Sequence, residues 1–172
     1  GGMERAHQKE SSWILLESGA VYSRFKSEYK MKGFSVEQLI TVYHQKKQID
    51  LEYNIPDWAG ERNRQLRVMF PLNMEKSAQV SYDVPMGMVH VGKDELTMRP
   101  GGSAWGGTYV QKSEEIHPRE IQNFMTANGS GFGFTMSTQV ATADWVDPSM
   151  NSADYPVINP VLLSSHKSCH GE

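Results

Sequence analysis

The chain has 172 residues, with 17 basic and 20 acidic side chains and a formal charge of −3. This balance excludes the basic excess with which proteins bind nucleic acid or anionic membranes. Its apolar runs are far shorter than the roughly 20 residues of a transmembrane helix, and its single cysteine, Cys169, excludes an internal disulfide framework. We expect neither a nucleic-acid nor a membrane partner, and the composition is compatible with the bacterial cytoplasm, the periplasm or secretion.

The first part of the chain shows strand alternation rather than a helical period. Residues 1–11 are polar, lack the apolar stretch of a signal peptide, and start with two glycines that look like a tag remnant or leader. Residues 13–18 and 20–33 follow as strands, and in the second of them apolar residues and serines alternate with Arg, Lys and Glu. Residues 36–55 predict two more strands, joined by a polar turn near 45–48. This alternation is typical of half-buried antiparallel strands.

The rest of the chain alternates strand segments with turns. The predicted strand segments are residues 65–73, 78–92, 131–146 and 156–165. Residues 97–107 have turn composition and predict a surface loop. Residues 117–127 fit either one short helix or a strand, and the segment 131–146 fits either a strand pair or one long bent strand. The GSGFG motif at 129–133 predicts a hairpin turn with positive φ at glycine.

Many strands and turns without a sustained helix predict an all-β antiparallel sandwich. The length suits one domain of ordinary size, so we expect a single β-sandwich domain over residues 12–172. The apolar strand at 156–165 is followed almost at once by the end of the chain, without an obvious terminal cap. We therefore expect a fragment of a longer chain.

Several phrases of the sequence resemble one known family. They are VYHQKKQIDLEYNIPDW (42–58), YDVPMGMVHVGKDE (82–95), IHPREIQNFM (116–125), GSGFGFTMSTQVATADWVDP (129–148) and YPVINPVLLSSHKSCHGE (155–172). The similarity extends from about residue 12 to the end, and it is to the β-domain of bacterial proteins related to glycoside hydrolase family 38, the α-mannosidases. The resemblance implies a supersandwich, similar in architecture to galactose mutarotase, that follows a catalytic α/β barrel and a helical domain in the parent chain.

The resemblance also implies where the chemistry lies. In the family, the zinc ion and the nucleophilic aspartate sit mainly on the barrel, and hydrolysis retains configuration through a covalent glycosyl-enzyme intermediate. Retention needs two carboxyl groups ~5 Å apart, and the barrel's motifs do not occur in this sequence. We expect a β-domain that is inactive alone, with no catalytic residue and no cofactor, and with zinc in the parent's barrel. Its expected partners are that barrel, the helical domain and carbohydrate.

Metal binding has one compact candidate group at the end of the chain. His166, Cys169 and His170 are zinc-ligand types, but neither a CxxC nor an HExxH motif is present. A polar tail is the preferred interpretation, and no metal site is assigned.

Four residues are candidates for carbohydrate binding: Trp105, His117, Arg119 and Asp144. Trp105 lies in a glycine-rich loop, where its ring could stack on a sugar or, as we favour for Trp105 and Trp58, pack at a domain interface. Arg119, with the adjacent Glu120, could bond a sugar hydroxyl or form a surface ion pair.

Asp144 is the better carboxylate candidate in the ADWVDP segment. Alternation places Asp144 and Val146 on one face, opposite Trp145, whereas Asp147 before Pro148 predicts a turn residue. Two alternative functions remain open. One is a stand-alone carbohydrate-binding module, and the other is an aldose 1-epimerase that would use a histidine such as His90 or His117 with a glutamate base.

Overall fold

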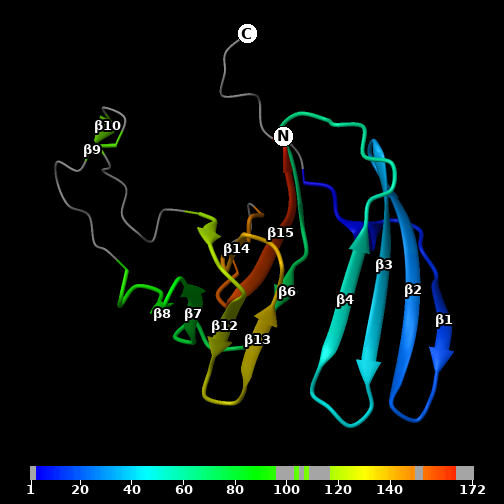
Figure 1. Ribbon diagram of the computed structural model, residues 1–172, viewed down its shortest axis with the longest axis horizontal. Coiled ribbons are helices and arrows are strands. Elements are labelled where there is room, and N and C mark those ends of the chain that lie inside the picture. The colour runs from blue at the N-terminus through cyan, green and yellow to red at the C-terminus, as the bar shows by residue number, and fades with distance from the viewer. Residues whose placement is uncertain (1–2, 96–102, 105–106, 109–116, 150–152, 166–172) are drawn as a thin grey trace. The chain divides into compact units, whose positions relative to one another are not determined.

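The computed structural model describes residues 3–95, 103–104, 107–108, 117–149 and 153–165 (Figure 1). The chain divides into two compact units, Gly1–Arg62 with Lys167–Glu172, and Asn63–His166. The described residues form antiparallel strands and one short 3-10 helix, Ala6–Gln8, so the predicted all-β antiparallel fold is confirmed. No helix that could cross a membrane occurs in this described part. One sandwich domain over residues 12–172 remains a prediction.

The first unit is a four-stranded antiparallel sheet in chain order. Its strands are β1 (Trp13–Ser18), β2 (Tyr22–Met31), β3 (Phe34–Tyr43) and β4 (Ile49–Asn54), and all four were predicted. The register places Phe25, Ile40 and Leu51 in one row, so one face of the sheet is apolar. The other face carries ion pairs: Lys26 contacts Glu28 at 2.7 Å and Glu37 at 2.6 Å.

The first strand is more exposed than its apolar sequence suggests. β1 pairs only with β2 and lies at the edge of the sheet. Although its sequence is apolar, all six of its residues are exposed, and Trp13 is 51% exposed. Strand alternation was therefore a sound guide to secondary structure here, but it did not report burial.

The second unit contains two sheets. One has the order β11 (Arg119–Glu120), β14 (Thr142–Asp144), β15 (Val157–Ser165) and β5 (Arg64–Arg67), with β6 (Phe70–Pro71) also paired to β15. The other has the order β13 (Gly133–Ser137), β12 (Phe124–Asn128), β7 (Gln79–Val84) and β8 (Gly87–His90). A separate short pair joins β9 (Ser103–Ala104) to β10 (Gly107–Thr108).

A shared hydrophobic core makes the second unit a sandwich. Met125 and Ala127 from β12, Ala143 from β14 and Ile158 from β15 belong to one buried cluster, and each is 0% exposed. Because β12 lies in one sheet and β14 and β15 lie in the other, the inner faces of the two sheets pack on each other.

The structure decides between the open interpretations of this region. Residues 117–127 form strands β11 and β12 rather than a helix. The segment 131–146 forms two strands that do not pair with each other, because β13 pairs with β12 while β14 pairs with β11 and β15. The chain thus crosses from one sheet to the other between residues 137 and 142.

The GSGFG segment is a hairpin turn, as predicted, but its predicted backbone conformation is wrong. β12 and β13 pair directly across it, yet the glycines with positive φ lie elsewhere, at Gly33, Gly60 and Gly92. Glu75 instead approaches the turn closely: its carboxylate accepts the Ser130 N–H at 2.6 Å. A Cβ at Gly129 would lie 2.9 Å from Glu75 Oε2, so glycine here provides space rather than an unusual dihedral angle.

Candidate functional site

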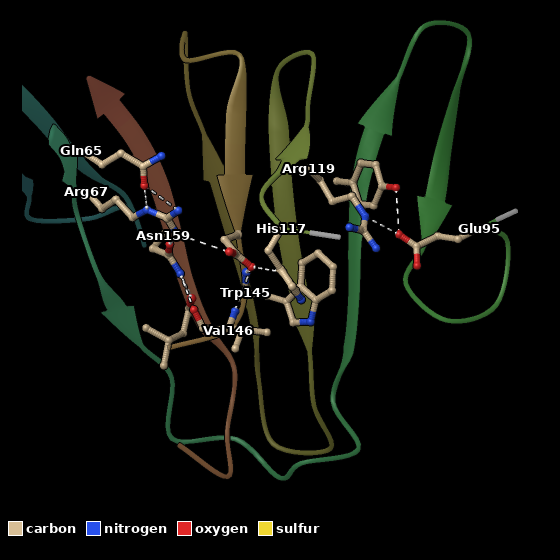
Figure 2. Close-up of polar contacts among 11 residues, drawn as sticks. Gln65, Arg67, Glu95, His117, Arg119, Trp145, Val146 and Asn159 are labelled. Carbon is tan, nitrogen blue, oxygen red and sulfur yellow. Dashed lines mark hydrogen bonds and ion pairs between the residues drawn. The ribbon is translucent and has the colours of Figure 1, made fainter. Parts of the chain in front are cut away.

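Asp144 is the centre of a polar cluster in the second unit (Figure 2). It ends β14 and is 3% exposed. Its Oδ1 accepts hydrogen bonds from His117 Nδ1 at 2.7 Å and from the backbone N–H of Trp145 at 2.8 Å and Val146 at 3.2 Å. A carboxylate can only accept, so an ionised Asp144 requires the proton on His117 Nδ1. Asp144 therefore both terminates a strand and orients an imidazole ring.

The backbone turn around Asp144 corrects the predicted faces of this segment. Asp144 is buried, but Val146 is 40% exposed, so the two do not share a face. The strand ends at Asp144, and strand alternation no longer applies beyond it. Asp147 has the predicted turn role, because its Oδ1 accepts the Ser149 N–H at 2.8 Å.

Arg67 and Asn159 support Asp144 from two other strands. Arg67 of β5 donates from Nη1 to Asp144 Oδ2 at 3.3 Å and to Asn159 Oδ1 at 2.8 Å. Asn159 of β15 is 0% exposed, and its amide donates to the carbonyls of Val146 at 3.1 Å and Val157 at 2.6 Å. The carboxylate, the guanidinium and the amide thus bond to one another with little access to water, which holds them in one arrangement.

Sequence reasoning missed Arg67 and Asn159, although a signal for each was present. Arg67 interrupts the apolar segment LRVMF, and Asn159 interrupts PVINPVLL. A single polar residue in an otherwise buried strand requires a hydrogen-bonding partner. The partners lie 77 and 92 residues from Arg67 in the sequence, so only the strand pairing identifies them.

Arg119 belongs to a second buried ion pair beside this cluster. It lies in β11 and is 7% exposed, and its Nε contacts Glu95 Oε1 at 2.8 Å. The structure does not support the alternative of a surface ion pair with Glu120, because adjacent strand residues point to opposite faces and only Glu120 is exposed. The Tyr82 hydroxyl also donates to Glu95 Oε1, at 3.0 Å.

The two partners of this ion pair are both held in their charged forms. Burial by itself would raise the pKa of Glu95, but hydrogen bonds from Arg119 and the Gly92 N–H outweigh it, and the Glu95 pKa lies below its ordinary value. Burial would lower the pKa of Arg119, but the Glu95 contact keeps it raised. The pKa of Tyr82 is raised by burial and by its bond to Glu95.

Trp145 links the two ion pairs. Its ring lies 4.9 Å from the His117 ring, centroid to centroid, and its centroid lies 5.0 Å from the guanidinium carbon of Arg119. Figure 2 shows His117, Trp145 and Arg119 beside one another. The structure therefore brings three of the four predicted sugar-binding residues, His117, Arg119 and Asp144, into one cluster around Trp145.

The remaining predicted residues lie apart from this cluster or cannot be placed. Trp105 and the group His166, Cys169 and His170 lie outside the described residues. Trp58 belongs to the first unit and packs edge-on against Phe34, with ring centroids 5.1 Å apart. Within the described ranges, three or more His, Cys, Asp or Glu side chains do not gather in a way that could hold a metal ion.

A comparison with known protein families identifies the family of this chain. Residues 3–100, more than half of the chain, match the family described as Glycosyl hydrolases family 38 C-terminal domain. The chain belongs to this family. The predicted β-domain of a family 38 glycoside hydrolase is thus confirmed, while the phrases at 116–125, 129–148 and 155–172 lie beyond the matched span. The comparisons with curated proteins and with solved structures gave no match.

Proposed function

We propose that this family 38 domain packs on the catalytic part of a longer glycoside hydrolase and helps to shape its sugar-binding cleft. The proposal rests on the His117 imidazole, which is partly exposed and is hydrogen-bonded to the buried Asp144 carboxylate. The His117 side chain is 26% exposed, whereas that of Asp144 is 5% exposed and that of Arg67 is 14% exposed. A polar ring that is held by buried partners and still reaches the surface suits the recognition of sugar hydroxyls.

The three clustered residues have different proposed roles. His117 is the side chain that contacts sugar. Asp144 positions the His117 ring, and Arg119 acts through Trp145, because both Asp144 and Arg119 are buried. Trp105 remains a predicted sugar contact. Trp145 supports the cluster, because its ring contacts both His117 and Arg119.

The electrostatics of the domain support a role without chemistry. A glycosidase general acid needs a raised pKa to hold its proton near neutral pH. The pKa of Glu95 is instead lowered, since its bonds to Arg119 and Gly92 outweigh burial. This carboxylate suits a fixed structural anion better than a proton donor.

The zinc ion that the resemblance implies is assigned to the parent's barrel. The described residues offer no cluster of three metal-ligand types, so the domain as described does not fit a zinc site. The proposed contribution of this chain is therefore to hold and orient sugar, and the retaining hydrolysis proposed for the parent takes place on the barrel.

Steady-state kinetics of the parent enzyme test the proposal. His117→Ala should raise KM for an aryl α-mannoside by about tenfold, which corresponds to the loss of about one sugar hydrogen bond, and should leave kcat nearly unchanged. Glu120→Gln, an exposed residue three positions further along the chain, is the matched control and should change neither constant. An unchanged KM in the folded His117→Ala enzyme would remove His117 from the sugar site.

A further inference from the structure

A row of four side chains crosses the polar face of the sheet in the first unit, one from each strand. In strand order they are Glu17, Tyr22, Tyr43 and Asp50. Tyr22 and Tyr43 are direct cross-strand partners. Glu17 and Asp50 share their face, because Glu17 pairs with Arg24 and Asp50 pairs with Thr41 in the adjacent strands. The row crosses three strand spacings, roughly 14 Å.

Hydrogen bonds fix both ends of this row. The Tyr22 hydroxyl donates to Glu17 Oε2 at 3.0 Å, and the Tyr43 hydroxyl donates to Asp50 Oδ2 at 2.7 Å. Gln48 Nε2 donates to the other Asp50 oxygen at 2.9 Å. The two tyrosine rings meet edge to face, with centroids 6.2 Å apart and planes at 64°. The rings and carboxylates are therefore held in one geometry before any ligand arrives.

The row lies at the accessible end of the sheet. Tyr22 begins β2 and Tyr43 ends β3, next to the turns at residues 19–21 and 44–48. Every residue of these two turns is exposed, as is Glu17. An aromatic pair flanked by carboxylates is thus presented at the surface, whereas the apolar row Phe25, Ile40 and Leu51 lies on the opposite face.

The surrounding charges distinguish between two kinds of ligand. Tyrosine rings with carboxylates can hold an organic cation or a sugar, whose C–H face packs on a ring while its hydroxyls donate to carboxylates. Here Arg24 lies beside the row, bound to Glu52 at 2.7 Å, and Lys46 Nζ lies 5.6 Å from the Tyr43 ring centroid. These two cations offset two of the three carboxylate charges of Glu17, Asp50 and Glu52. The attraction for a cation is thereby weakened, which favours a neutral ligand with many hydroxyl groups.

We propose that the row Glu17, Tyr22, Tyr43 and Asp50 is a binding surface for a neutral oligosaccharide. This site belongs to the first unit and shares no residue with the His117 cluster of the second unit. It goes beyond the cleft role proposed above and does not depend on it. Its length predicts that an oligosaccharide binds more tightly than a monosaccharide, because several sugar units can contact the row at once.

Calorimetric titration of the 172-residue protein with mannose, α-linked mannobiose, mannotriose and cellobiose tests the site. At least one oligosaccharide should bind saturably and more tightly than mannose. Tyr43→Ala should weaken that binding by about tenfold or more, and Asp50→Asn should weaken it while preserving side-chain shape. Glu28→Gln, whose side chain on the same strand face is 66% exposed, is the matched control and should bind like the wild type. If circular dichroism shows that Tyr43→Ala does not fold, two milder variants replace it. Asp50→Asn removes only the charge, and Tyr43→Phe removes only the hydroxyl.

Four outcomes would overturn the proposal. The first is the absence of saturable binding for all four sugars, and the second is equal binding by the wild type and the folded row variants. The third is saturable binding of tetramethylammonium at the row without sugar binding, which would show a cation site. Sugar binding that survives Tyr43→Ala but is lost in His117→Ala would also overturn this proposal, while supporting the role proposed for the His117 cluster.

Discussion

The Asp83 carboxylate holds the turn that joins β11 to β12, and removing it should destabilise the second unit. Asp83 is 6% exposed. Its oxygens accept the backbone N–H of Gln122 at 3.0 Å, of Asn123 at 2.8 and 2.9 Å and of Phe124 at 2.9 Å, as well as the Asn123 amide at 2.8 Å. Asp83→Ala therefore removes the acceptor of three donor groups, whereas the Gln122 N–H keeps its bond to the Asp83 carbonyl at 3.3 Å.

The size of the effect follows from the exposure of these donors. A hydrogen bond to a charged group contributes about 1.5–3 kcal/mol. Gln122 and Asn123 are exposed residues, so water can replace part of what the carboxylate provides. We therefore expect Asp83→Ala to lower the free energy of unfolding by about 3 kcal/mol. This equals the loss of one or two such hydrogen bonds without compensation by water.

Urea unfolding followed by circular dichroism measures this change. Asp154→Ala is the matched control, because the Asp154 side chain is 91% exposed and its ion pair at 3.8 Å is with Lys76, which is exposed as well. The control should change the unfolding free energy by less than about 0.5 kcal/mol. A loss below about 1 kcal/mol in Asp83→Ala would refute the reasoning, since the carboxylate would then be replaceable by water.

The ionisation of Asp83 should make the free energy of unfolding depend on pH. Burial by itself would raise the pKa of Asp83, but the backbone N–H groups of Asn123 and Phe124 outweigh it, and the folded pKa is lowered. A lowered folded pKa gives a stabilisation that is complete above the unfolded value of about 3.9 and is lost as pH falls through the folded pKa. Unfolding free energies measured from pH 7 down to about pH 3 should fall less steeply in Asp83→Ala than in the wild type. Parallel curves would contradict this assignment.

Two further substitutions test the buried ion pair and the core. Glu95→Gln leaves the Arg119 charge buried without its counter-ion and should cost about 3–5 kcal/mol in thermal or urea unfolding; an unchanged midpoint would show that the pair does not matter for stability. Met125→Ala, at a site that is 0% exposed, should cost about 2–5 kcal/mol, whereas Met86→Ala, at a fully exposed hairpin tip, should change stability little. Equal losses in these two variants would contradict the described core.

The local pattern of the sequence was sufficient to predict most strands. β1 to β4 follow from alternation and from the polar turn at 45–48, because each of these strands pairs with its neighbour in the sequence. Alternation could not show that β13 and β14 lie in different sheets, because both are strands in either arrangement. Pairing partners that are distant in sequence depend on tertiary packing rather than on local propensity.

The candidate site was predicted only in part, because several of its contacts also join residues that are distant in the sequence. His117, Arg119 and Asp144 were chosen by residue type and by proximity in the sequence, and the structure brings them together around Trp145. Their supporting residues come from other parts of the chain, and the partners of these residues could be identified only after the strands were paired: Arg67, Glu95 and Asn159.

The central claim is that this domain helps to hold sugar in a family 38 glycoside hydrolase without performing the chemistry. Hydrolysis of an aryl α-mannoside by the purified 172-residue protein tests this claim most directly. The account predicts no release of the aryl group above the buffer rate, both for the wild type and for Asp144→Ala. Turnover by the wild type that Asp144→Ala abolishes would contradict it, because the catalytic carboxylate would then lie in this domain.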